Sequence, residues 1–396
     1  MTPWGAEEEI DNQALFGRTI LQVAPALDAS PAGIACVEVA AGLAEAGARA
    51  LVAGAPGPLV SELQARGGVF LPFAAATFNP WKAMLNRRRL ERLVIREGVE
   101  LIHVRAAAGA QAAHFAARRA RIPLVADFEP GHGDLALEAD SIMVFSRAAM
   151  DLATKTRPEM ASRFIHGVRG VDLRRFTPES VDWSRTRRLR EALGVKAHER
   201  LIIGVNLPDD RQKIFLAAAA QLKAKGFFGN DSQQARFVWL RREADEAASK
   251  AFADEAEKMG VTGEALQIVG DDRAAACLAA ALVVVTAGEA GLCVEAQALG
   301  APVALIQQDG AGQASDSVDG ICAPPQVEAQ MRTGWLVPAN QPQALAKAAE
   351  EAVRLGATAR ESFAQRARAH ARNFSTERMC ALTLAVYARH FSGGGA

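Results

Sequence analysis

The sequence predicts an α/β protein built from two doubly wound domains with parallel sheets. The chain has 396 residues, which is too long for one ordinary hydrophobic core. Short apolar segments alternate with helical patterns through short connections, an order typical of parallel strands covered by helices on both faces. The alternation stops in the Gly- and Pro-containing segment 167–178 and then restarts, so the join between the domains is expected there.

The amino-terminal domain is expected to span residues 18–176, after a loose tail at residues 1–17. Strands are predicted at 19–24, 48–53, 69–73, 101–104, 124–126 and 141–145, and helices at 35–46, 61–66, 86–98 and 111–121. The helix at 35–46 carries Val37, Ala40 and Ala44 on one face and ends at Gly47, and residues 25–33 before it are expected to form a loop.

The carboxyl-terminal domain repeats this pattern over residues 177–375. Strands are predicted at 201–205, 237–240, 266–269, 279–285 and 302–306, and helices at 185–193, 214–225, 244–259, 341–354 and 361–372. A last helix is expected within residues 376–396, where Met379, Leu384 and Val386 are apolar.

Composition places the chain among globular proteins, because half of its residues are hydrophobic and 23% are charged. Lys and Arg total 45 and so do Asp and Glu, and a net charge of zero argues against a nucleic-acid binder. The five cysteines show no paired spacing, so neither a disulfide framework nor a zinc site is expected. The start of the chain lacks a basic-then-apolar signal pattern, and no apolar run reaches about 18 residues, so a cytoplasmic protein is expected.

Residues 286–302 form the most informative segment, because a buried strand is followed there by a loop, an Ala-rich helix and another strand. Two carboxylates, Glu289 and Glu295, lie near the start of the helix, and Glu295 is expected on its first turn. A helix N-terminus presents free N–H groups and a partial positive charge, so the backbone N–H groups of Gly291 and Leu292 suit a phosphate. A carboxylate beside them can hold a sugar or ribose hydroxyl.

Six landmarks stand out along the chain: Ile20–Pro25, Ile102–Arg105, Arg169–Phe176, Val269–Arg273, Val294–Val303 and Thr333–Pro338. Their order is similar to that found in family-4 retaining glycosyltransferases. Together they span roughly residues 18–390, and the chain therefore resembles this family as a whole.

The resemblance implies the GT-B fold, in which two Rossmann-like domains face each other across a cleft. The carboxyl-terminal domain would hold a nucleotide-sugar donor, the amino-terminal domain would hold a glycan or lipid-linked acceptor, and the last helix would cross back onto the first domain. No metal or other cofactor is expected, because basic side chains and a helix N-terminus would neutralise the diphosphate leaving group. Transfer with retention, in cell-envelope polysaccharide or lipopolysaccharide synthesis, is the implied activity.

The resemblance also implies roles for residues of the donor site. Glu295 would hold the donor ribose and Glu289 the donor sugar, although the segment between them is shorter than in the family and Glu289 is equally compatible with a plain loop carboxylate. Asn206 occupies the position of an arginine that clamps the diphosphate, and Arg211 occupies that of a lysine, with Lys213 close by. Arg211 and Lys213 either replace the family's cations or are solvated loop charges.

Two further positions would serve the reaction from the amino-terminal domain. Gly33 lies where the family has a Gly-Gly pair, which lets the backbone approach the nucleotide-sugar closely. Pro31 removes a backbone N–H group from this segment. His132 is the candidate for a histidine near the reacting carbon, and its alternative is an exposed loop residue. His103, at a strand end, is expected to be a packed, hydrogen-bonded core residue.

The helix that contains Arg87–Arg96 is the most basic part of the chain. Its apolar residues Leu85, Leu90, Leu93 and Val94 are expected to face the core. Its charged face is compatible with peripheral contact to anionic lipid at the inner face of a membrane, or with an ordinary solvated surface.

The altered donor motif leaves other functions open. A weakened or inactive homologue that acts as a binding or scaffold protein is the main alternative to a transferase. A sugar-nucleotide epimerase on the same fold is a further hypothesis, which the landmarks at Arg169–Phe176 and Thr333–Pro338 disfavour.

Overall fold

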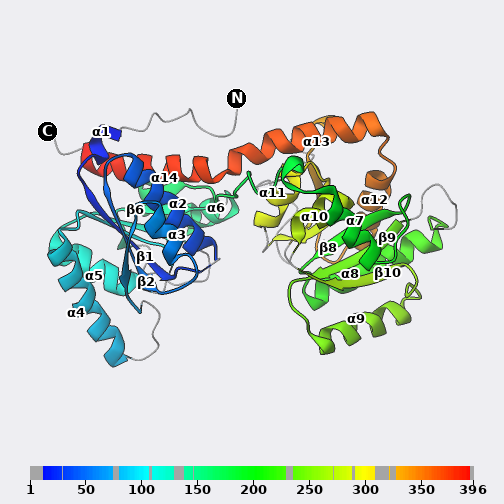
Figure 1. Cartoon of the computed structure of the whole chain (residues 1–396), viewed down its shortest axis with the longest axis horizontal. Coiled ribbons are helices and arrows are strands. Elements are labelled where there is room, and N and C mark those ends of the chain that lie inside the picture. The colour runs from blue at the N-terminus through cyan, green and yellow to red at the C-terminus, as the bar shows by residue number, and fades with distance from the viewer. Residues whose placement is uncertain are drawn as a thin grey trace. The chain divides into compact units, whose positions relative to one another are not determined.

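The computed structural model describes two compact α/β units, and it confirms the predicted fold class (Figure 1). The amino-terminal unit consists of two segments, one that ends at Gly170 and one that begins at Ser375. Val171–Phe374 form the carboxyl-terminal unit. Every described strand pair is parallel. The described residues are 12–28, 30–74, 80–106, 109–128, 138–145, 147–228, 235–270, 272–287, 290–307, 321 and 327–392.

The amino-terminal unit contains a seven-stranded sheet in the order β3-β2-β1-β4-β5-β6-β7. Its strands are β1 (Thr19–Ala26), β2 (Arg49–Ala55), β3 (Val69–Pro72), β4 (Leu101–Val104), β5 (Leu124–Phe128), β6 (Ser141–Val144) and β7 (Phe164–His166). The chain adds β2 and β3 on one side of β1 and then returns to add β4 to β7 on the other side. The winding direction therefore changes between β1 and β4.

Helices cover both faces of this sheet. They are α1 (Asn12–Leu15), α2 (Pro31–Glu45), α3 (Val60–Ala65), α4 (Pro80–Glu97), α5 (Ala110–Ala120), α6 (Arg147–Thr156) and α14 (Thr376–Ser392). Leu21, Val23 and Ile102 pack with Leu90 of α4 and Ala113 of α5 on one face. Because side chains alternate along a strand, the intervening positions face α2 and α14, which pack on each other.

Several helices begin earlier than predicted, because local capping decides where they start. The expected loop at 25–33 is wrong at its end: α2 begins at Pro31, where the Ser30 hydroxyl accepts the Gly33 N–H at 3.3 Å. Proline also opens α4, at Pro80. The structure adds α6 and β7, which the sequence did not indicate, and within the expected tail Leu15 of α1 is buried.

The carboxyl-terminal unit contains a six-stranded sheet in the order β10-β9-β8-β11-β12-β13, so its winding direction changes between β8 and β11. Its strands are β8 (Arg200–Val205), β9 (Ala235–Arg241), β10 (Ala265–Val269), β11 (Ala280–Thr286), β12 (Val303–Ile306) and β13 (Gly334–Val337). Its α-helices are α7 (Trp183–Ala192), α8 (Asp209–Ala224), α9 (Glu246–Lys258), α10 (Arg273–Ala279), α11 (Ala290–Ala298), α12 (Pro342–Val353) and α13 (Ala357–Ala371).

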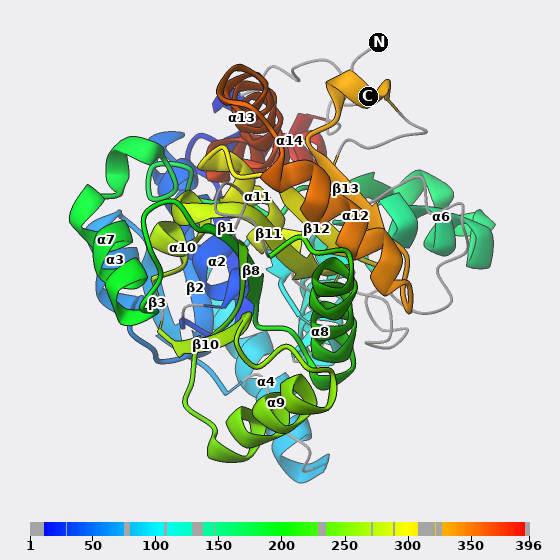
Figure 2. The same cartoon turned by 90° about the vertical axis from the view of Figure 1, so that its right-hand side faces the viewer.

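Two apolar clusters lie on the two faces of this second sheet. One joins Ile202 and Phe237 to Phe215 of α8 and Leu345 of α12, and Figure 2 shows α8 and α12 side by side. The other joins the opposite strand face to α10 and α11. Short 3₁₀ helices occur at Pro158–Arg163, Pro178–Ser180, Ala329–Met331 and Arg372–Phe374. Among the described residues, no helix combines the length and the apolar character needed to span a bilayer.

The chain crosses between the two units twice, after Gly170 and after Phe374, and the two crossing segments lie side by side. The Val171 N–H donates to the Phe374 carbonyl at 2.8 Å. A Cβ added at Gly170 would lie 2.8 Å from the Thr376 Cα, so only glycine fits this part of the Arg169–Phe176 landmark.

Close packing of α14 on α2 makes Gly42 a sensitive position. A Cβ there would clash with Cys380 Sγ and lie 3.1 Å from Leu384 Cδ1, both on α14. Gly42→Ala is therefore expected to lower the free energy of unfolding by on the order of 1–3 kcal/mol, despite the better helix propensity of alanine. Gly263→Ala is the control, because no atom of the described residues lies within 4 Å of its added Cβ. Equal unfolding midpoints of the two variants in urea would contradict this account of the α2–α14 contact.

Candidate functional site

The carboxyl edge of β8 and β11 is the first candidate site, because open parallel sheets bind ligands where the winding direction changes. Ile203 and Gly204 of β8 pair with Val283 and Val284 of β11. The chain then leaves β8 for α8 on one face and β11 for α11 on the other. The N-termini of α8 and α11 therefore both follow this edge, and each presents backbone N–H groups that lack partners within the helix.

Asn206 makes the tight turn from β8 into α8. Its φ of 47° lies in the left-handed region, which asparagine tolerates better than most residues. Its N–H donates to the Leu240 carbonyl at 3.0 Å, and α8 begins shortly afterwards at Asp209. The residue at the family's arginine position thus has a clear role in shaping the chain, and its role toward a donor stays a prediction.

Arg211 and Lys213 lie on the first turns of α8 and not in a loop, so the loop placement in the alternative is wrong, while their role toward a donor stays a prediction. The helix starts five residues before the predicted Ile214, directly after Pro208, which is its N-cap. Arg211 is 7% exposed, with its Nε 3.4 Å from an Asp210 carboxylate oxygen, whereas Lys213 is exposed. Asp209 and Asp210 stabilise the helix N-terminus, but they also oppose an incoming anion.

Glu295 lies on the second turn of α11, so its expected place on the first turn is wrong. The helix already begins at Ala290, and its first turn contains no acidic residue. Burial of Leu292, Cys293 and Val294 holds these early turns against the core. The Glu295 carboxylate lies 3.5 Å from the Arg273 guanidinium, and its side chain is 13% exposed.

Gly291, in contrast, is exposed at the start of α11. Among the described residues, no atom lies within 4 Å of a Cβ added there, so this part of the structure leaves open space beside the first turn. The Leu292 side chain is buried, so this residue can serve a ligand only through its backbone. The N-terminal turn of α11 is therefore accessible, as phosphate binding requires.

A charged pair that the sequence did not indicate supports the neighbouring helix α10. Asp272 caps α10 by accepting the Ala275 N–H at 3.0 Å and also binds Arg185 through two hydrogen bonds of 2.6 and 2.8 Å. The Arg185 contact is the main reason why the pKa of Asp272 is lowered. Arg273 follows Asp272 and is held beside Glu295. The only sequence signal for this arrangement is the Val269–Arg273 landmark.

Gly33, in the amino-terminal unit, serves local packing. A Cβ there would clash with the Asp28 carbonyl, and its N–H already donates to the Ser30 hydroxyl. Pro31 occupies the first position of α2, where no intrahelical hydrogen bond is lost. A role of Gly33 toward the donor stays a prediction. Two other predicted site residues, His132 and Glu289, lie outside the described residues.

A buried polar network lies on the α14-facing side of the first sheet. His103 Nδ1 is 2.6 Å from the Tyr387 hydroxyl, and its Nε2 is 2.7 Å from an Asp127 carboxylate oxygen. Arg105 lies 3.5 Å from the other Asp127 oxygen and donates twice to the Gln22 side-chain carbonyl, at 2.7 and 3.1 Å. Arg105 and Asp127 come at the carboxyl ends of β4 and β5, next to the change in winding direction.

The environment of His103 determines how the protons are placed in this network. Burial, and then the nearby positive charge of Arg105, lower the pKa of His103 to about 4, so the ring is neutral at pH 7. Burial opposes ionisation of Asp127, but its contacts with His103 and Arg105 prevail and lower its pKa. We therefore assign Nε2–H as the donor to Asp127 and Nδ1 as the acceptor from the Tyr387 O–H.

The structure confirms the sequence expectation that His103 is a hydrogen-bonded core residue. The sequence did not reveal its partners, because Tyr387 lies 284 residues away. One feature of the sequence could have drawn attention to this partner, because Tyr387 is the only tyrosine in the chain. Through this contact the network ties α14 to the sheet of the amino-terminal unit.

The neutral state of His103 predicts how stability depends on pH. In the unfolded chain His103 takes up a proton near its ordinary pKa of 6.5, whereas the folded protein resists protonation down to about pH 4. Stability should therefore fall as the pH is lowered through this window. His103→Gln should be less stable at neutral pH and should show a smaller further loss in acid.

Thermal unfolding of the wild type and of this variant between about pH 7 and pH 4 measures the difference. His198→Gln, at an exposed residue, is the control and should keep the wild-type profile. If the two variants have parallel profiles, the proposed proton placement at His103 is wrong.

Comparison with known proteins identifies the fold. No protein-family model matches the sequence, and no curated protein matches it either. A glycosyltransferase from Rickettsia africae is similar in structure, with a TM-score of 0.77 and 16% identity over 96% of this chain and 100% of that chain. The chain has the GT-B fold. At this level of identity, the likeness shows the fold alone.

Two further solved structures support this result. Anabaena Alr3699/HepE in complex with UDP and glucose matches with a TM-score of 0.67 and 19% identity, over 91% of this chain and 97% of that chain. WaaG, a glycosyltransferase involved in lipopolysaccharide biosynthesis, matches with a TM-score of 0.62 and 12% identity, over 95% and 100% of the two chains.

Proposed function

We propose that the protein is a glycosyltransferase that moves a sugar, with retention, from a nucleotide-sugar to a glycan or lipid-linked acceptor in cell-envelope polysaccharide or lipopolysaccharide synthesis. The accessible first turn of α11 at the winding change of the carboxyl-terminal sheet carries this proposal. Similar folds support it: HepE has been solved with UDP-glucose, and WaaG is involved in lipopolysaccharide biosynthesis. We place the protein in the cytoplasm, with no metal requirement.

The donor would bind mainly through the backbone. The N–H groups of Gly291 and Leu292 would hold the diphosphate, and the exposed Lys213 would add a positive charge. Glu295 would accept a ribose hydroxyl while Arg273 keeps its carboxylate ionised and in place. Arg211 is a second candidate cation, and Glu289 and His132 are assigned to the donor sugar and the reacting carbon.

A catalytically weakened homologue is the second candidate function, and Asn206 is the observation that favours it. An arginine that stabilises the leaving diphosphate would contribute on the order of 2–4 kcal/mol to the transition state. Asn206 cannot supply this charge, and Asp209 and Asp210 follow it closely. Such a protein would bind a nucleotide-sugar but turn it over slowly.

A first test measures donor binding by thermal shift and calorimetry with UDP-, GDP- and ADP-sugars. At least one should raise the melting temperature, because a ligand that binds only the folded state stabilises it. Glu295→Gln should weaken binding of that donor about ten-fold or more, because a charge-assisted hydrogen bond is lost. Glu246→Gln, on the exposed first turn of α9, is the matched control.

These measurements separate the two candidate functions. Binding followed by transfer or hydrolysis supports the enzyme, and binding without turnover supports the weakened homologue. If none of the sugars binds, the donor site is wrongly assigned. An inverted anomeric centre in the product, detected by NMR, would contradict retention.

The exposed face of α4 supports our proposal of peripheral membrane contact. Trp81, Met84, Leu85 and Ile95 are 74%, 43%, 55% and 67% exposed, and helical spacing places them on one side. Leu85 was expected to face the core, which is wrong, because the amino-terminal turns of α4 extend beyond the core contacts of Leu90 (Figure 1).

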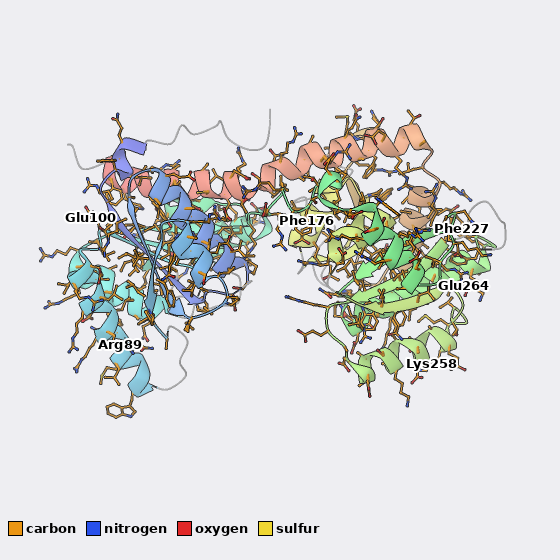
Figure 3. The ribbon with its side chains drawn as sticks, viewed as in Figure 1. Arg89, Glu100, Phe176, Phe227, Lys258 and Glu264 are labelled. Atoms are coloured by element: carbon orange, nitrogen blue, oxygen red, sulfur yellow. The ribbon has the colours of Figure 1, made fainter. Side chains whose placement is uncertain are left out.

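Arginines interleave with these apolar side chains. Arg88, Arg89 and Arg92 are exposed, and Figure 3 labels Arg89 on this helix. Apolar side chains that enter the headgroup region, flanked by arginines that meet lipid phosphates, are typical of helices that lie on a membrane surface. The acceptor of the proposed reaction, if lipid-linked, would be reached from such a position.

Vesicle co-sedimentation tests this contact. The triple variant Trp81→Ala, Arg88→Glu and Arg92→Glu should lose binding to vesicles that contain phosphatidylglycerol, because both the apolar and the electrostatic attraction are removed. The control is Trp183→Ala, Arg187→Glu and Arg188→Glu on α7, which makes the same chemical changes on another exposed helix. If both triple variants bind as the wild type does, α4 is an ordinary solvated surface.

A further inference from the structure

A pocket of about 690 Å³ lies at the amino edge of the first sheet. Its lining includes Leu124, the first residue of β5, and two residues that directly precede strands, Asp140 before β6 and Arg163 before β7. The end of α5 completes it. Open parallel sheets bind ligands at the opposite, carboxyl edge, where the winding direction changes, so this pocket is separate from the proposed transfer site.

Arginine dominates the lining, through Arg118, Arg121, Arg157 and Arg163. The pocket also contains three carboxylates, each of which already has a hydrogen-bond or ion-pair partner. His114 Nε2 lies 2.7 Å from Glu138, the Leu124 N–H donates to Asp140 at 2.9 Å, and Arg157 lies 3.7 Å from Glu159.

The guanidinium groups of Arg118 and Arg121 remain available to a ligand. Within the part of the chain that the structure describes, neither makes a hydrogen bond or ion pair. A guanidinium presents several N–H donors in a planar fork that matches the oxygens of a phosphate. Two such groups in one pocket favour an anion with several oxygens.

The backbone of Arg121 is a second, independent indication. Arg121 ends α5 with a φ of 57°, in the left-handed region where glycine is the usual residue. The other non-glycine residues with positive φ in the described chain are both asparagines. An arginine in this conformation costs on the order of 1 kcal/mol. Favourable interaction with the helix dipole does not explain an arginine at position 121, because Arg118 and Arg119 already place positive charge in the last turn. Such strain indicates a functional side chain.

We propose that this pocket binds a phosphorylated sugar or polyol. The phosphate would lie between Arg118 and Arg121, and the carboxylates of Glu138 and Asp140 would accept hydroxyl groups. The carboxylates also disfavour a bare anion, so the pocket selects a ligand that combines a phosphate with hydroxyls. A free sugar phosphate and a phosphorylated lipid headgroup share this chemistry.

The test uses the full-length protein and three probes: glucose 6-phosphate, inorganic phosphate, and phosphatidylcholine vesicles with and without phosphatidylinositol phosphate. The double variant Arg118→Gln with Arg121→Gly should weaken binding about ten-fold or more. Glycine suits the left-handed backbone at 121, so the variant should fold and its unliganded melting temperature should stay close to that of the wild type. Arg119→Gln is the matched control, because Arg119 is adjacent and exposed but does not line the pocket.

Binding of glucose 6-phosphate more tightly than phosphate identifies a soluble ligand, and binding only to the phosphoinositide vesicles identifies a lipid headgroup. Either result supports the proposal when the double variant loses binding of that probe and Arg119→Gln keeps it. Saturating UDP should leave the affinity unchanged, so the result does not depend on the proposed transferase activity. The proposal is overturned if no probe binds, if UDP competes, or if the double variant and the control behave alike.

Discussion

The winding of each parallel sheet is the constraint on which the rest of the structure depends. Crossover connections between parallel strands are right-handed, so strands added to the two sides of β1, or of β8, place their helices on opposite faces. The two sets of helices diverge between β1 and β4, and between β8 and β11. Each divergence leaves strand ends and helix N-termini accessible, and the residues proposed to hold the donor diphosphate occur at one of them.

Most of the positive charge at the proposed donor site is already engaged within the carboxyl-terminal unit, and the exposed Lys213 is the exception. Arg185 binds Asp272, Arg273 lies beside Glu295, and Arg211 is buried near Asp210. The backbone N–H groups at the start of α11 are therefore the main donors ready for a diphosphate, and they need no reorganisation when it binds. This arrangement explains how a chain with Asn206 at the family's arginine position could still bind a nucleotide-sugar.

The buried network of the amino-terminal unit complements the apolar packing of α14 on α2. Taking Asp127 and Arg105 out of water costs free energy, which is recovered only when each group meets its partners. Apolar contacts such as those of Cys380 and Leu384 around Gly42 are not directional, whereas the hydrogen bonds that link Tyr387, His103 and Asp127 are. The network therefore defines where the last helix lies.

The sequence by itself determined most of the order of strands and helices, the two-unit fold and the segment that precedes α11, but it did not indicate α6 or β7. These follow from apolar runs and periodicity, which are local properties of the chain. Helix starts were less certain, because Ser30, Pro80 and Pro208 act through capping geometry.

Only the tertiary structure decided which polar and charged groups meet. Arg105 and Gln22 are 83 residues apart, and the arginines of the pocket come from two separate segments. A single sequence shows the chemistry of each side chain, but the partner of a buried charge depends on which distant strands the fold brings together.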